Sequence, residues 1–417
     1  MISVSRRILV CVVGCILVLA PCADAAKDRA EAPPIQALRA LYENNKEFRT
    51  TMHKAFANMK DPDDPKTINL WPSPNRWRPI TSKAVNPWNG KKFDDLCKFF
   101  NNWYYLVPIN NDATFYEFTY IEEFAWFYYK NKFGQEIVRK EPGLSWSKDF
   151  VAARGKFMDS KESTATIQKW VADESVKIKE YIVPKDGFKS FNEFFVRDFK
   201  DKDKARPITS SDDDSVMVAP TDCRLNMINP LTPDAKIPTK LDHKLNVTEL
   251  LNRSGYAKYF ENGTAVSCIL LPHTYHHYHA VVSGKVVESR EDVAGAYWGI
   301  DDFGAFFNGG NVGYGQSYSV FEHFHRGYFV IETKEYGYVA MIPVGLDTIG
   351  SVVFENELKK VTQAEPVSVK KGDKLGHFAY GGSLVITLIE QDFSPINKIR
   401  PNKIKEVQLG EKIGSFK

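Results

Sequence analysis

Four histidines stand within seven residues in the segment from Leu271 to His279, the first three being His273, His276 and His277. Clustered imidazoles are good ligands for a metal ion, and they also act as general acids and bases near neutral pH. No carboxylate or thiol lies at a recognisable companion spacing for a metal site. The segment by itself therefore indicates metal binding and acid–base chemistry equally.

A serine and an aspartate elsewhere in the sequence could extend this chemistry. Ser383 follows Gly381 and Gly382 and precedes an apolar run, and Asp222 stands just after Pro220. Taken singly, Gly-Gly-Ser is typical of a tight turn, and the aspartate is typical of a turn residue. Together with a histidine they are the parts of a nucleophile with an oriented base. We therefore expect these segments to meet in one site.

From about Phe191 to Glu390, the content and order of such segments resemble the phosphatidylserine decarboxylase family. The segments that carry the resemblance are, in chain order, Phe194-Phe195-Val196-Arg197 with Arg206-Pro207-Ile208, Pro220-Thr221-Asp222, Tyr275-His276-His277-Tyr278-His279, Val344-Gly345 with Ile349-Gly350-Ser351, and Gly381-Gly382-Ser383. Two departures stand beside them. Phe324-His325-Arg326 keeps only the arginine of the family's Asn-Glu-Arg segment, and Leu384 follows the serine where Thr or Ser is common.

The resemblance implies that Asp222, His279 and Ser383 form a self-processing triad. His279, held by Asp222, would take the proton of the Ser383 hydroxyl, so that its oxygen attacks the carbonyl of Gly382. The chain would then be cut into residues 27–382 and 383–417, and Ser383 would become a pyruvoyl group. This covalent group is the cofactor that the resemblance implies, and we expect no metal.

A pyruvoyl ketone can condense with a substrate amine and accept the electrons that remain when CO2 departs. The resemblance therefore implies a carboxy-lyase that converts phosphatidylserine to phosphatidylethanolamine, in which His276 matches the histidine of the decarboxylation step. The alternative within the family is a decarboxylase of a soluble, for example aromatic, L-amino acid. Two other classes stay open: a serine hydrolase that uses the same residues, and a binding module, because residues 371–378 resemble a turn of biotinyl or lipoyl-like domains.

The first half of the sequence predicts helices. Apolar residues recur at steps of three and four from Ile35 to Met59, as on one face of a helix. Residues 93–100, 103–107 and 115–129 are dense in aromatic residues and are also predicted to be helical, in a region that ends near Tyr181. An aromatic stripe at this spacing indicates core packing rather than a binding face.

A turn at residues 184–187 opens a part of the sequence with short β-branched runs. Strands are predicted at residues 266–271, 281–288, 329–332, 338–344 and 384–389. We therefore predict an α+β fold with a helical domain at residues 27–185 and a β-rich catalytic domain at residues 186–417. The segment from Gly295 to Gly315 is rich in glycine and aromatic residues, which suits a mobile lid and an ordinary surface loop equally.

The first 26 residues are predicted to be a secretory signal peptide. Arg6-Arg7 precede an apolar run from Ile8 to Ala20, and Ala23-Asp24-Ala25 resembles a cleavage site. This run is shorter than the roughly 20 apolar residues that span a bilayer. N-glycosylation sequons at Asn246 and, further on, at residues 252 and 262 agree with a secretory route. We expect the protein in the secretory lumen, outside the cell or in a periplasm, with membrane association as a hypothesis.

Charge and cysteine content limit the partners. The formal net charge is only +3 and is spread along the chain, so nucleic acid is not expected as a partner. Peripheral contact with an anionic membrane surface fits this charge, and a homodimer is a further hypothesis. Beyond the predicted signal peptide only Cys97, Cys223 and Cys268 remain, which indicates neither a disulfide framework nor a metal site.

Overall fold

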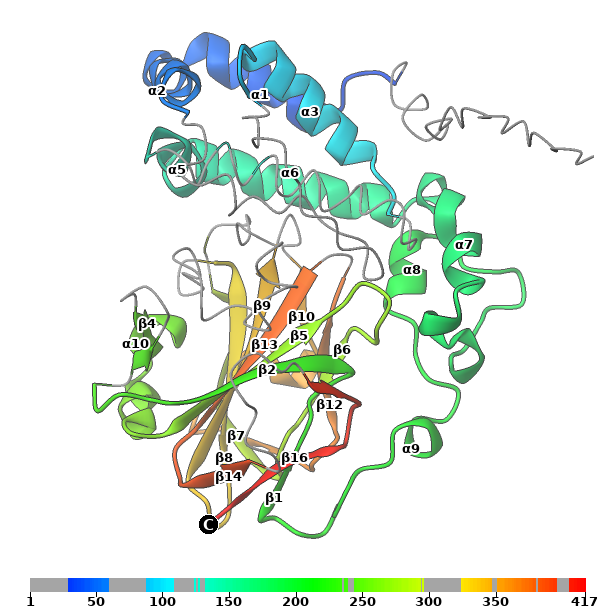
Figure 1. Cartoon of the computed structure of the whole chain (residues 1–417), viewed down its shortest axis with the longest axis vertical. Coiled ribbons are helices and arrows are strands. Elements are labelled where there is room, and N and C mark those ends of the chain that lie inside the picture. The colour runs from blue at the N-terminus through cyan, green and yellow to red at the C-terminus, as the bar shows by residue number, and fades with distance from the viewer. Residues whose placement is uncertain are drawn as a thin grey trace, which may run out of the picture. The chain divides into compact units, whose positions relative to one another are not determined.

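The computed structural model describes residues 29–59, 88–108, 124, 127, 132–234, 236–238, 244–293, 295, 324–346, 351–379, 382–395 and 405–417. Residues Ala32–Lys417 form one compact unit. The predicted signal peptide, most of the aromatic segment 115–129 and nearly all of the glycine-rich segment 295–315 lie outside the described residues. Figure 1 shows the elements and their order along the chain.

Helices dominate the described residues before Val216 (Figure 1). The α-helices are α1 (Pro33–Asn44), α2 (Lys46–Ala57), α3 (Phe93–Tyr105), α5 (Lys132–Arg139), α6 (Gly143–Met158), α7 (Ile167–Val171), α8 (Phe191–Phe195), α9 (Lys202–Ala205) and, among the strands, α10 (Val247–Leu250). Short 3-10 helices lie at Lys161–Thr166, Glu174–Val176, Ile178–Glu180, Gly255–Phe260 and Asn356–Leu358.

The single helix predicted from Ile35 to Met59 is wrong in one respect, because two helices, α1 and α2, occupy this segment. They meet at Asn45, whose backbone is extended (φ −111°, ψ 104°) and whose side chain accepts a hydrogen bond from the Phe48 N–H at 2.9 Å. An asparagine in this role satisfies a free N–H of the first turn and favours a new helix start. The apolar spacing continues across the break and therefore did not reveal it.

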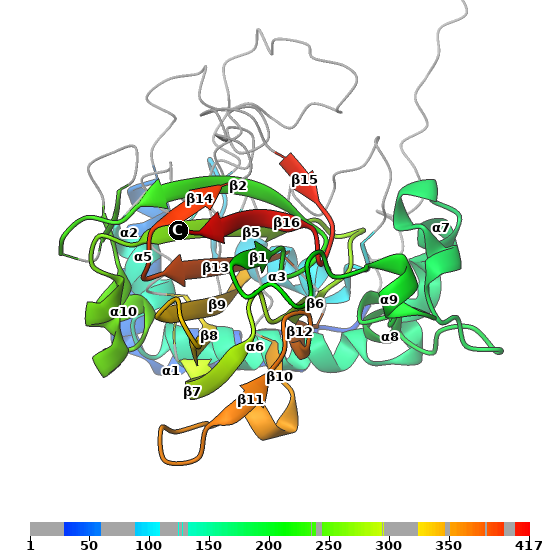
Figure 2. The ribbon, with the colours of Figure 1, turned by 90° about the horizontal axis from the view of Figure 1, so that it is seen from below.

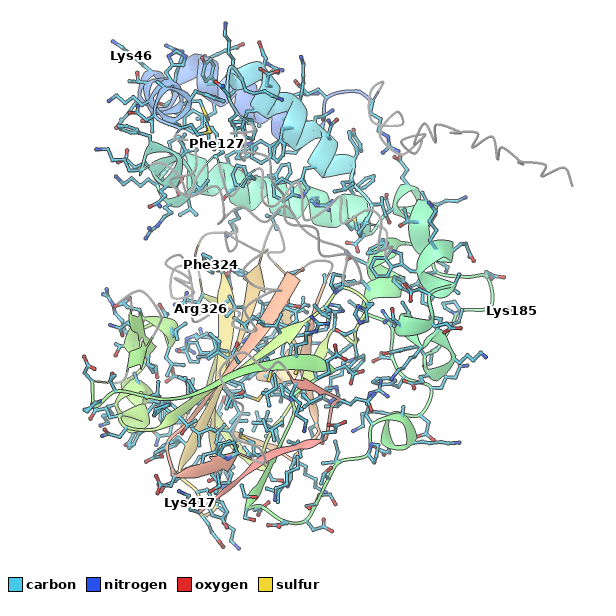
Figure 3. The ribbon with its side chains drawn as sticks, viewed as in Figure 1. Lys46, Phe127, Lys185, Phe324, Arg326 and Lys417 are labelled. Atoms are coloured by element: carbon cyan, nitrogen blue, oxygen red, sulfur yellow. The ribbon has the colours of Figure 1, made fainter. Side chains whose placement is uncertain are left out.

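Aromatic rings fill the space between these helices. The ring of Phe100 in α3 lies 4.9 Å from Trp146 and 5.3 Å from Phe150, both in α6. The indole N–H of Trp146 donates to the carbonyl of Pro34 in α1 at 2.7 Å, which ties α6 to the first helix. Phe127, labelled in Figure 3, is 1% exposed and belongs to the same core. The prediction that the aromatic stripe is core packing is confirmed for these residues.

Antiparallel strands form the second part of the fold. The strands are β1 (Val216–Val218), β2 (Cys223–Pro230), β3 (Lys236–Pro238), β4 (Lys244–Asn246), β5 (Thr264–Leu270), β6 (His277–His279), β7 (Gly284–Val293), β8 (Arg326–Glu332), β9 (Tyr338–Leu346), β10 (Val352–Phe354), β11 (Val367–Val369), β12 (Lys374–Phe378), β13 (Gly382–Ile389), β14 (Phe393–Pro395), β15 (Lys405–Val407) and β16 (Lys412–Phe416). Eight of them form one sheet in the order β11-β7-β8-β9-β13-β5-β2-β15.

Strand β13 lies inside this large sheet, paired with β9 on one side and β5 on the other. Because side chains alternate between the faces of a strand, Leu384 and Ile386 point to the core that also includes helix residues, whereas Val385 and Ile389 point to a second core. Ser383 shares the face of Val385. The apolar run after the serine is thus buried on both faces, which fixes the start of the strand.

Two smaller three-stranded sheets complete the strand layer around the second core. One has the order β10-β12-β6, and the other has the order β1-β16-β14, with β16 in the middle, as Figure 2 shows. Gly376 in β12 allows a close approach, because a Cβ there would lie 2.2 Å from the carbonyl oxygen of Val353 and 2.5 Å from the hydroxyl oxygen of Tyr278. A glycine at this position lets β12 lie close to both β10 and the histidine-bearing strand β6.

The predicted α+β class is confirmed, with helices first and antiparallel sheets after them. All five predicted strands are present, although β7 begins at Gly284 rather than Val281. The predicted turn is present too, since Gly187 N–H donates to Pro184 O at 2.9 Å and Gly187 has a φ of 77°. Helices α8 and α9 lie beyond residue 185, and the division into domains at that residue stays a prediction.

Candidate active site

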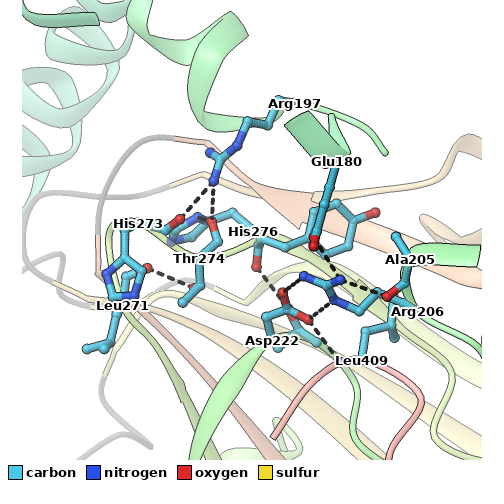
Figure 4. Close-up of polar contacts among 12 residues, drawn as sticks. Glu180, Arg197, Ala205, Arg206, Asp222, Leu271, His273, Thr274, His276 and Leu409 are labelled. Carbon is cyan, nitrogen blue, oxygen red and sulfur yellow. Dashed lines mark hydrogen bonds and ion pairs between the residues drawn. The ribbon is translucent and has the colours of Figure 1, made fainter. Parts of the chain in front are cut away.

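Asp222 lies between β1 and β2, where a buried arginine holds its carboxylate (Figure 4). Arg206 Nε donates to Oδ1 at 2.8 Å and Nη2 donates to Oδ2 at 2.6 Å, while the backbone N–H of Leu409 donates to Oδ1 at 3.0 Å. Arg206 is 3% exposed, and its Nη1 also donates to Glu180 Oε2 at 2.9 Å. This two-point pairing of guanidinium and carboxylate fixes both side chains.

The electrostatic balance of this pair favours the charged arginine. Burial alone would lower the pKa of the Arg206 guanidinium, but the hydrogen bonds and negative charge of Asp222 outweigh burial and raise that pKa above its ordinary value. The carboxylate of Asp222 therefore accepts its hydrogen bonds from Arg206 and Leu409 in this structure.

His279 is the last residue of β6 and is almost completely buried. Its Nδ1 lies 2.8 Å from the carbonyl oxygen of Gly372, and its Nε2 lies 3.1 Å from the hydroxyl of Tyr275. Because a carbonyl oxygen only accepts, Nδ1 carries the proton and Nε2 accepts from the tyrosine. Burial, with the nearby charges of Lys202 and Lys374, lowers the pKa of His279 to about 4. The imidazole is thus neutral at neutral pH, with its basic nitrogen at Nε2.

Two hydrogen bonds to backbone carbonyls hold the aspartate segment beside the histidine segment. The backbone N–H of His279 donates to Pro220 O at 2.9 Å, and the hydroxyl of Thr221 donates to Tyr275 O at 2.9 Å. The side chains of Asp222 and His279 do not bond to each other, so the expected contact between them is absent in this structure. Asp222 acts on His279 only through its charge, which is the weakest of the influences that set the pKa of His279.

Ser383 is the second residue of β13 and is 1% exposed. It pairs with Leu270 of β5 and Gly345 of β9, while Gly382 pairs with Leu346. Its hydroxyl oxygen has no hydrogen-bond partner among the described residues. A buried hydroxyl without a partner is costly in a folded protein and calls for an explanation, and Ser267 and Thr387 carry such hydroxyls as well.

The histidine segment and the cleavage segment lie close together through their backbones. The backbone N–H of Phe378 donates to His276 O at 2.9 Å, and Phe378 stands only four residues before Gly382. The structure thus brings β6 and the segment that leads to Ser383 together, but it does not join His279 to the Ser383 hydroxyl by a hydrogen bond. The self-processing triad therefore stays a prediction.

His276 is fully buried and stacks on Phe195 of α8, with 3.7 Å between the ring centres. Its Nδ1 lies 2.9 Å from Thr274 O, and its Nε2 has no hydrogen-bond partner among the described residues. Burial, followed by the charge of Arg197, holds the pKa of His276 well below its usual range. The ring is therefore neutral and presents a free nitrogen lone pair, as substrate positioning or proton delivery requires.

The segment after α8 fixes the histidine run. Arg197 is buried, and its Nη2 donates to His273 O at 2.8 Å and to Thr274 O at 3.3 Å (Figure 4). Its guanidinium carbon lies 4.4 Å from the centre of the Tyr181 ring. His277 Nε2 lies 2.9 Å from the backbone carbonyl oxygen of Val196, the residue just before Arg197. Each of these contacts holds one backbone or ring position of the run.

Several of these residues stand in the sequence motifs, but their roles are apparent only in the structure. Arg206 and Phe195 belong to the segments that carried the resemblance, but nothing in their spacing shows that they hold Asp222 and His276. Tyr275 also belongs to such a segment, but its bond to His279 was not predicted. Gly372, the other partner of His279, had no signal of its own, because it is 93 residues from His279 in sequence.

The metal hypothesis finds no cluster to support it in the part of the chain that the structure describes. Within these residues no group of at least three His, Cys, Asp or Glu side chains could hold a metal ion. His276 and His279 each direct Nδ1 at a backbone carbonyl, and His277 directs Nε2 at one. Cys97, Cys223 and Cys268 form no disulfide bond in the described part of the chain.

A cavity of about 760 Å³ lies between helix α6 on one side and strands β7, β10 and β12 on the other. Its lining includes His325, Ser351, His377 and Ala379. Arg326, the residue kept from the family's Asn-Glu-Arg segment, donates instead to the backbone carbonyls of Leu250 and Phe324, each at 2.8 Å, and Figure 3 labels it at the start of β8. It fixes the backbone, while its neighbour His325 reaches the cavity.

Comparison with known proteins matches the second part of the chain. The family model described as phosphatidylserine decarboxylase matches residues 191–415, a range that contains Asp222, His276, His279 and Ser383. Helix α6 lies outside this match.

Similar curated proteins include bacterial and plant relatives. The phosphatidylserine decarboxylase proenzyme of Fusobacterium nucleatum is 29% identical over 296 residues, which cover 70% of this chain and 90% of the relative. The proenzyme of Clostridium novyi is 29% identical over 274 residues, covering 64% of this chain and 85% of the relative. Phosphatidylserine decarboxylase proenzyme 2 of Oryza sativa subsp. japonica is 31% identical over 248 residues, covering 59% and 36% respectively.

Proposed function

We propose, because this chain belongs to the phosphatidylserine decarboxylase family, that it is a carboxy-lyase that converts phosphatidylserine to phosphatidylethanolamine and CO2. The observation that carries the proposal is that the family match spans Asp222, His276, His279 and Ser383. The relatives named above are phosphatidylserine decarboxylases, and none of them supports the alternative of a soluble amino acid as substrate.

We further propose that the cofactor is a pyruvoyl group made from Ser383 after cleavage of the Gly382–Ser383 bond. The names of the relatives as proenzymes support a processing step. The residues present fit this group, since the Ser383 hydroxyl is buried, unpaired among the described residues and fixed between two strands. Such a group supplies an electron sink for the loss of CO2. The products would be residues 27–382 and 383–417.

His279 is the base that the structure best supports for the cleavage. Its Nε2 carries the lone pair, and the ring is neutral because burial lowers its pKa to about 4. In this structure Nε2 accepts from Tyr275, so His279 has to exchange the tyrosine hydroxyl for the Ser383 hydroxyl before it can take the proton. Asp222, held by Arg206, supplies a fixed negative charge near the imidazole of His279. This charge stabilises the cation that forms when the imidazole accepts the proton.

His276 is proposed to act on the substrate during decarboxylation. The free Nε2 of the neutral ring can accept a proton from the substrate, or return a proton to the carbon atom that has lost CO2. Its stacking on Phe195 and the anchoring of Thr274 by Arg197 hold that nitrogen in one place.

We also propose where the protein acts. The sequence pattern of residues 1–26 supports a signal peptide and hence a secretory lumen, the outside of the cell or a periplasm. Within the described residues, no helix combines the length and apolar character needed to cross a bilayer. Access to a phospholipid would then come through peripheral contact with the membrane surface, and a homodimer is a separate proposal.

The experiment that tests this function is a comparison of substrates. Purified protein is supplied with phosphatidylserine in mixed micelles or with free L-tyrosine or L-phenylalanine, and CO2 release is measured. We expect release from the lipid only, and Ser383→Ala should abolish it. Release from a free amino acid with none from the lipid would replace the proposed substrate by the alternative.

A further inference from the structure

The 760 Å³ cavity beside the cleavage segment has a size typical of small-molecule sites, which run on the order of 300–1,000 Å³. One of its walls is α6, which lies outside the family-matched range. The opposite wall contains Ala379. Three peptide steps separate Ala379 from Gly382, so their Cα atoms lie no more than about 11 Å apart. The cavity therefore opens within reach of the Gly382–Ser383 bond.

One face of α6 presents two lysines to this cavity. Lys148, Ala152 and Lys156 stand four residues apart, line the cavity and are exposed. Residues at this spacing share one side of a helix, and the small side chain of Ala152 leaves room between the two long lysine side chains. Neither ammonium group forms a hydrogen bond or an ion pair with a described residue.

The carboxylates around the cavity, in contrast, already have partners in the protein. Glu291 Oε1 accepts from the Phe354 N–H at 2.9 Å, and Asp159 Oδ1 accepts from Asn192 Nδ2 at 2.8 Å. Glu193 accepts from the backbone N–H of residue 189.

The last carboxylate, Asp292, lies 3.3 Å from Nδ1 of His325. The charge of Lys148 reaches His325 as well, and after burial it helps to lower the pKa of that ring, which places this lysine close to the far wall of the cavity. Hydrogen bonds from neutral groups leave these carboxylates charged, so the attraction of this wall for an anion comes from the ammonium groups of Lys148 and Lys156.

We propose that Lys148 and Lys156 of α6 bind the phosphodiester of a glycerophospholipid headgroup, so that α6 supplies part of the substrate site. An ammonium group binds a phosphate oxygen through a charge-assisted hydrogen bond, and two such groups on one wall suit the paired free oxygens of a phosphodiester. The identity of the lipid as phosphatidylserine rests on the proposed function. The amine and carboxylate of the headgroup would then extend from α6 toward the segment of Ala379.

The first test separates binding from chemistry. Lys148→Ala/Lys156→Ala is compared with wild type and with Lys161→Ala/Lys169→Ala, a control that removes the same charge from exposed positions outside the cavity lining. The cavity variant should raise the KM for phosphatidylserine in mixed micelles by about tenfold and leave kcat and self-cleavage unchanged, as expected when uniform binding is lost. Lys148→Arg/Lys156→Arg should restore most of the affinity. An unchanged KM in the alanine variant would overturn the inference.

The second test needs no catalytic activity. Calorimetry on the full-length Ser383→Ala protein measures the binding of sn-glycero-3-phosphoserine, inorganic phosphate and L-serine. We expect binding of glycerophosphoserine that weakens about tenfold in the cavity variant and not in the control, weaker binding of phosphate, and none of serine. Headgroup binding that is equal in the two variants, or phosphate binding as tight as headgroup binding, would refute the assignment even if phosphatidylserine turnover is intact. If turnover is absent while headgroup binding depends on the lysines, the proposed function fails and the inference stands.

Discussion

At the scale of single residues, the site is defined by which polar atoms have partners and which do not. Asp222 is bound by Arg206, and His279 is bound at both ring nitrogens. The Ser383 hydroxyl and His276 Nε2 have no hydrogen-bond partner among the described residues. The charged pair is thus fixed, while the two atoms proposed to react have no partner among the described residues.

The buried pair of Asp222 and Arg206 should contribute strongly to stability. In a Ser383→Ala background, Asp222→Asn leaves the guanidinium of Arg206, which is 3% exposed, without its main partner. We expect the free energy of unfolding in urea to fall by about 3 kcal/mol. The control is Glu406→Gln, which removes a 74% exposed partner of Arg224 and should cost less than about 1 kcal/mol. Equal losses in the two variants would show that the buried pair is not special.

At the scale of elements, α8 and β6 are the two pieces that set the histidine geometry. The α8 helix supplies the Phe195 ring that covers His276. The two residues just after α8 bind the His277 ring and the backbone carbonyl of His273. The β6 strand is held in turn by β12, through register pairs such as His277 with His377. A change in α8 should therefore affect His276 more than His279.

Phe195→Leu should separate the two chemical steps. Loss of the stacked ring frees His276 to rotate, so we expect kcat for decarboxylation to fall by about tenfold. Self-cleavage, followed by the appearance of the 383–417 fragment, should keep its wild-type rate. Phe191→Leu is the matched control, because Phe191 lies in the same helix and its ring contacts Trp170, Phe194 and Phe195 but not His276. If both variants lose kcat equally, stacking on His276 has no special role.

Elements were the part of the fold that the sequence could predict. Nearly continuous apolar runs such as 384–389 are buried on both faces, and this local property is visible without knowing the partners. The break at Asn45 was missed because apolar spacing runs through it, and a cap depends on one side chain. The site residues were identified through a resemblance, while their contacts depend on chain segments far apart, as with Arg206 and Asp222 or Gly372 and His279.

At the scale of the whole molecule, the buried histidines make the fold sensitive to acid. Burial lowers the pKa of His279 to about 4, and it also holds the pKa values of His276 and His277 well below their usual range. In the unfolded chain the same groups bind a proton near pH 6.5. The unfolded state therefore takes up protons first as the pH falls, and stability is lost from pH 6.5 downward.

The pH dependence of unfolding tests this balance. In the Ser383→Ala protein, the free energy of unfolding should be constant near pH 7.5 and fall as the pH drops below 6.5. The share of His279 at pH 5 is about 2 kcal/mol, because its folded pKa lies below that pH. His279→Gln should reduce the loss between pH 7.5 and pH 5 by this amount, measured by urea titration. A variant that loses as much stability as its parent would contradict a neutral, buried His279.

The central claim is that folding leads this chain to break before Ser383 and to convert that residue into its cofactor. The most direct measurement is intact-mass analysis of the purified wild-type protein beside Ser383→Ala. We predict two chains in the wild type, with a fragment of residues 383–417 whose first residue carries a ketone in place of its amino group, and one uncut chain in the variant. A folded wild-type protein that stays a single chain with an ordinary serine at 383 would contradict the account.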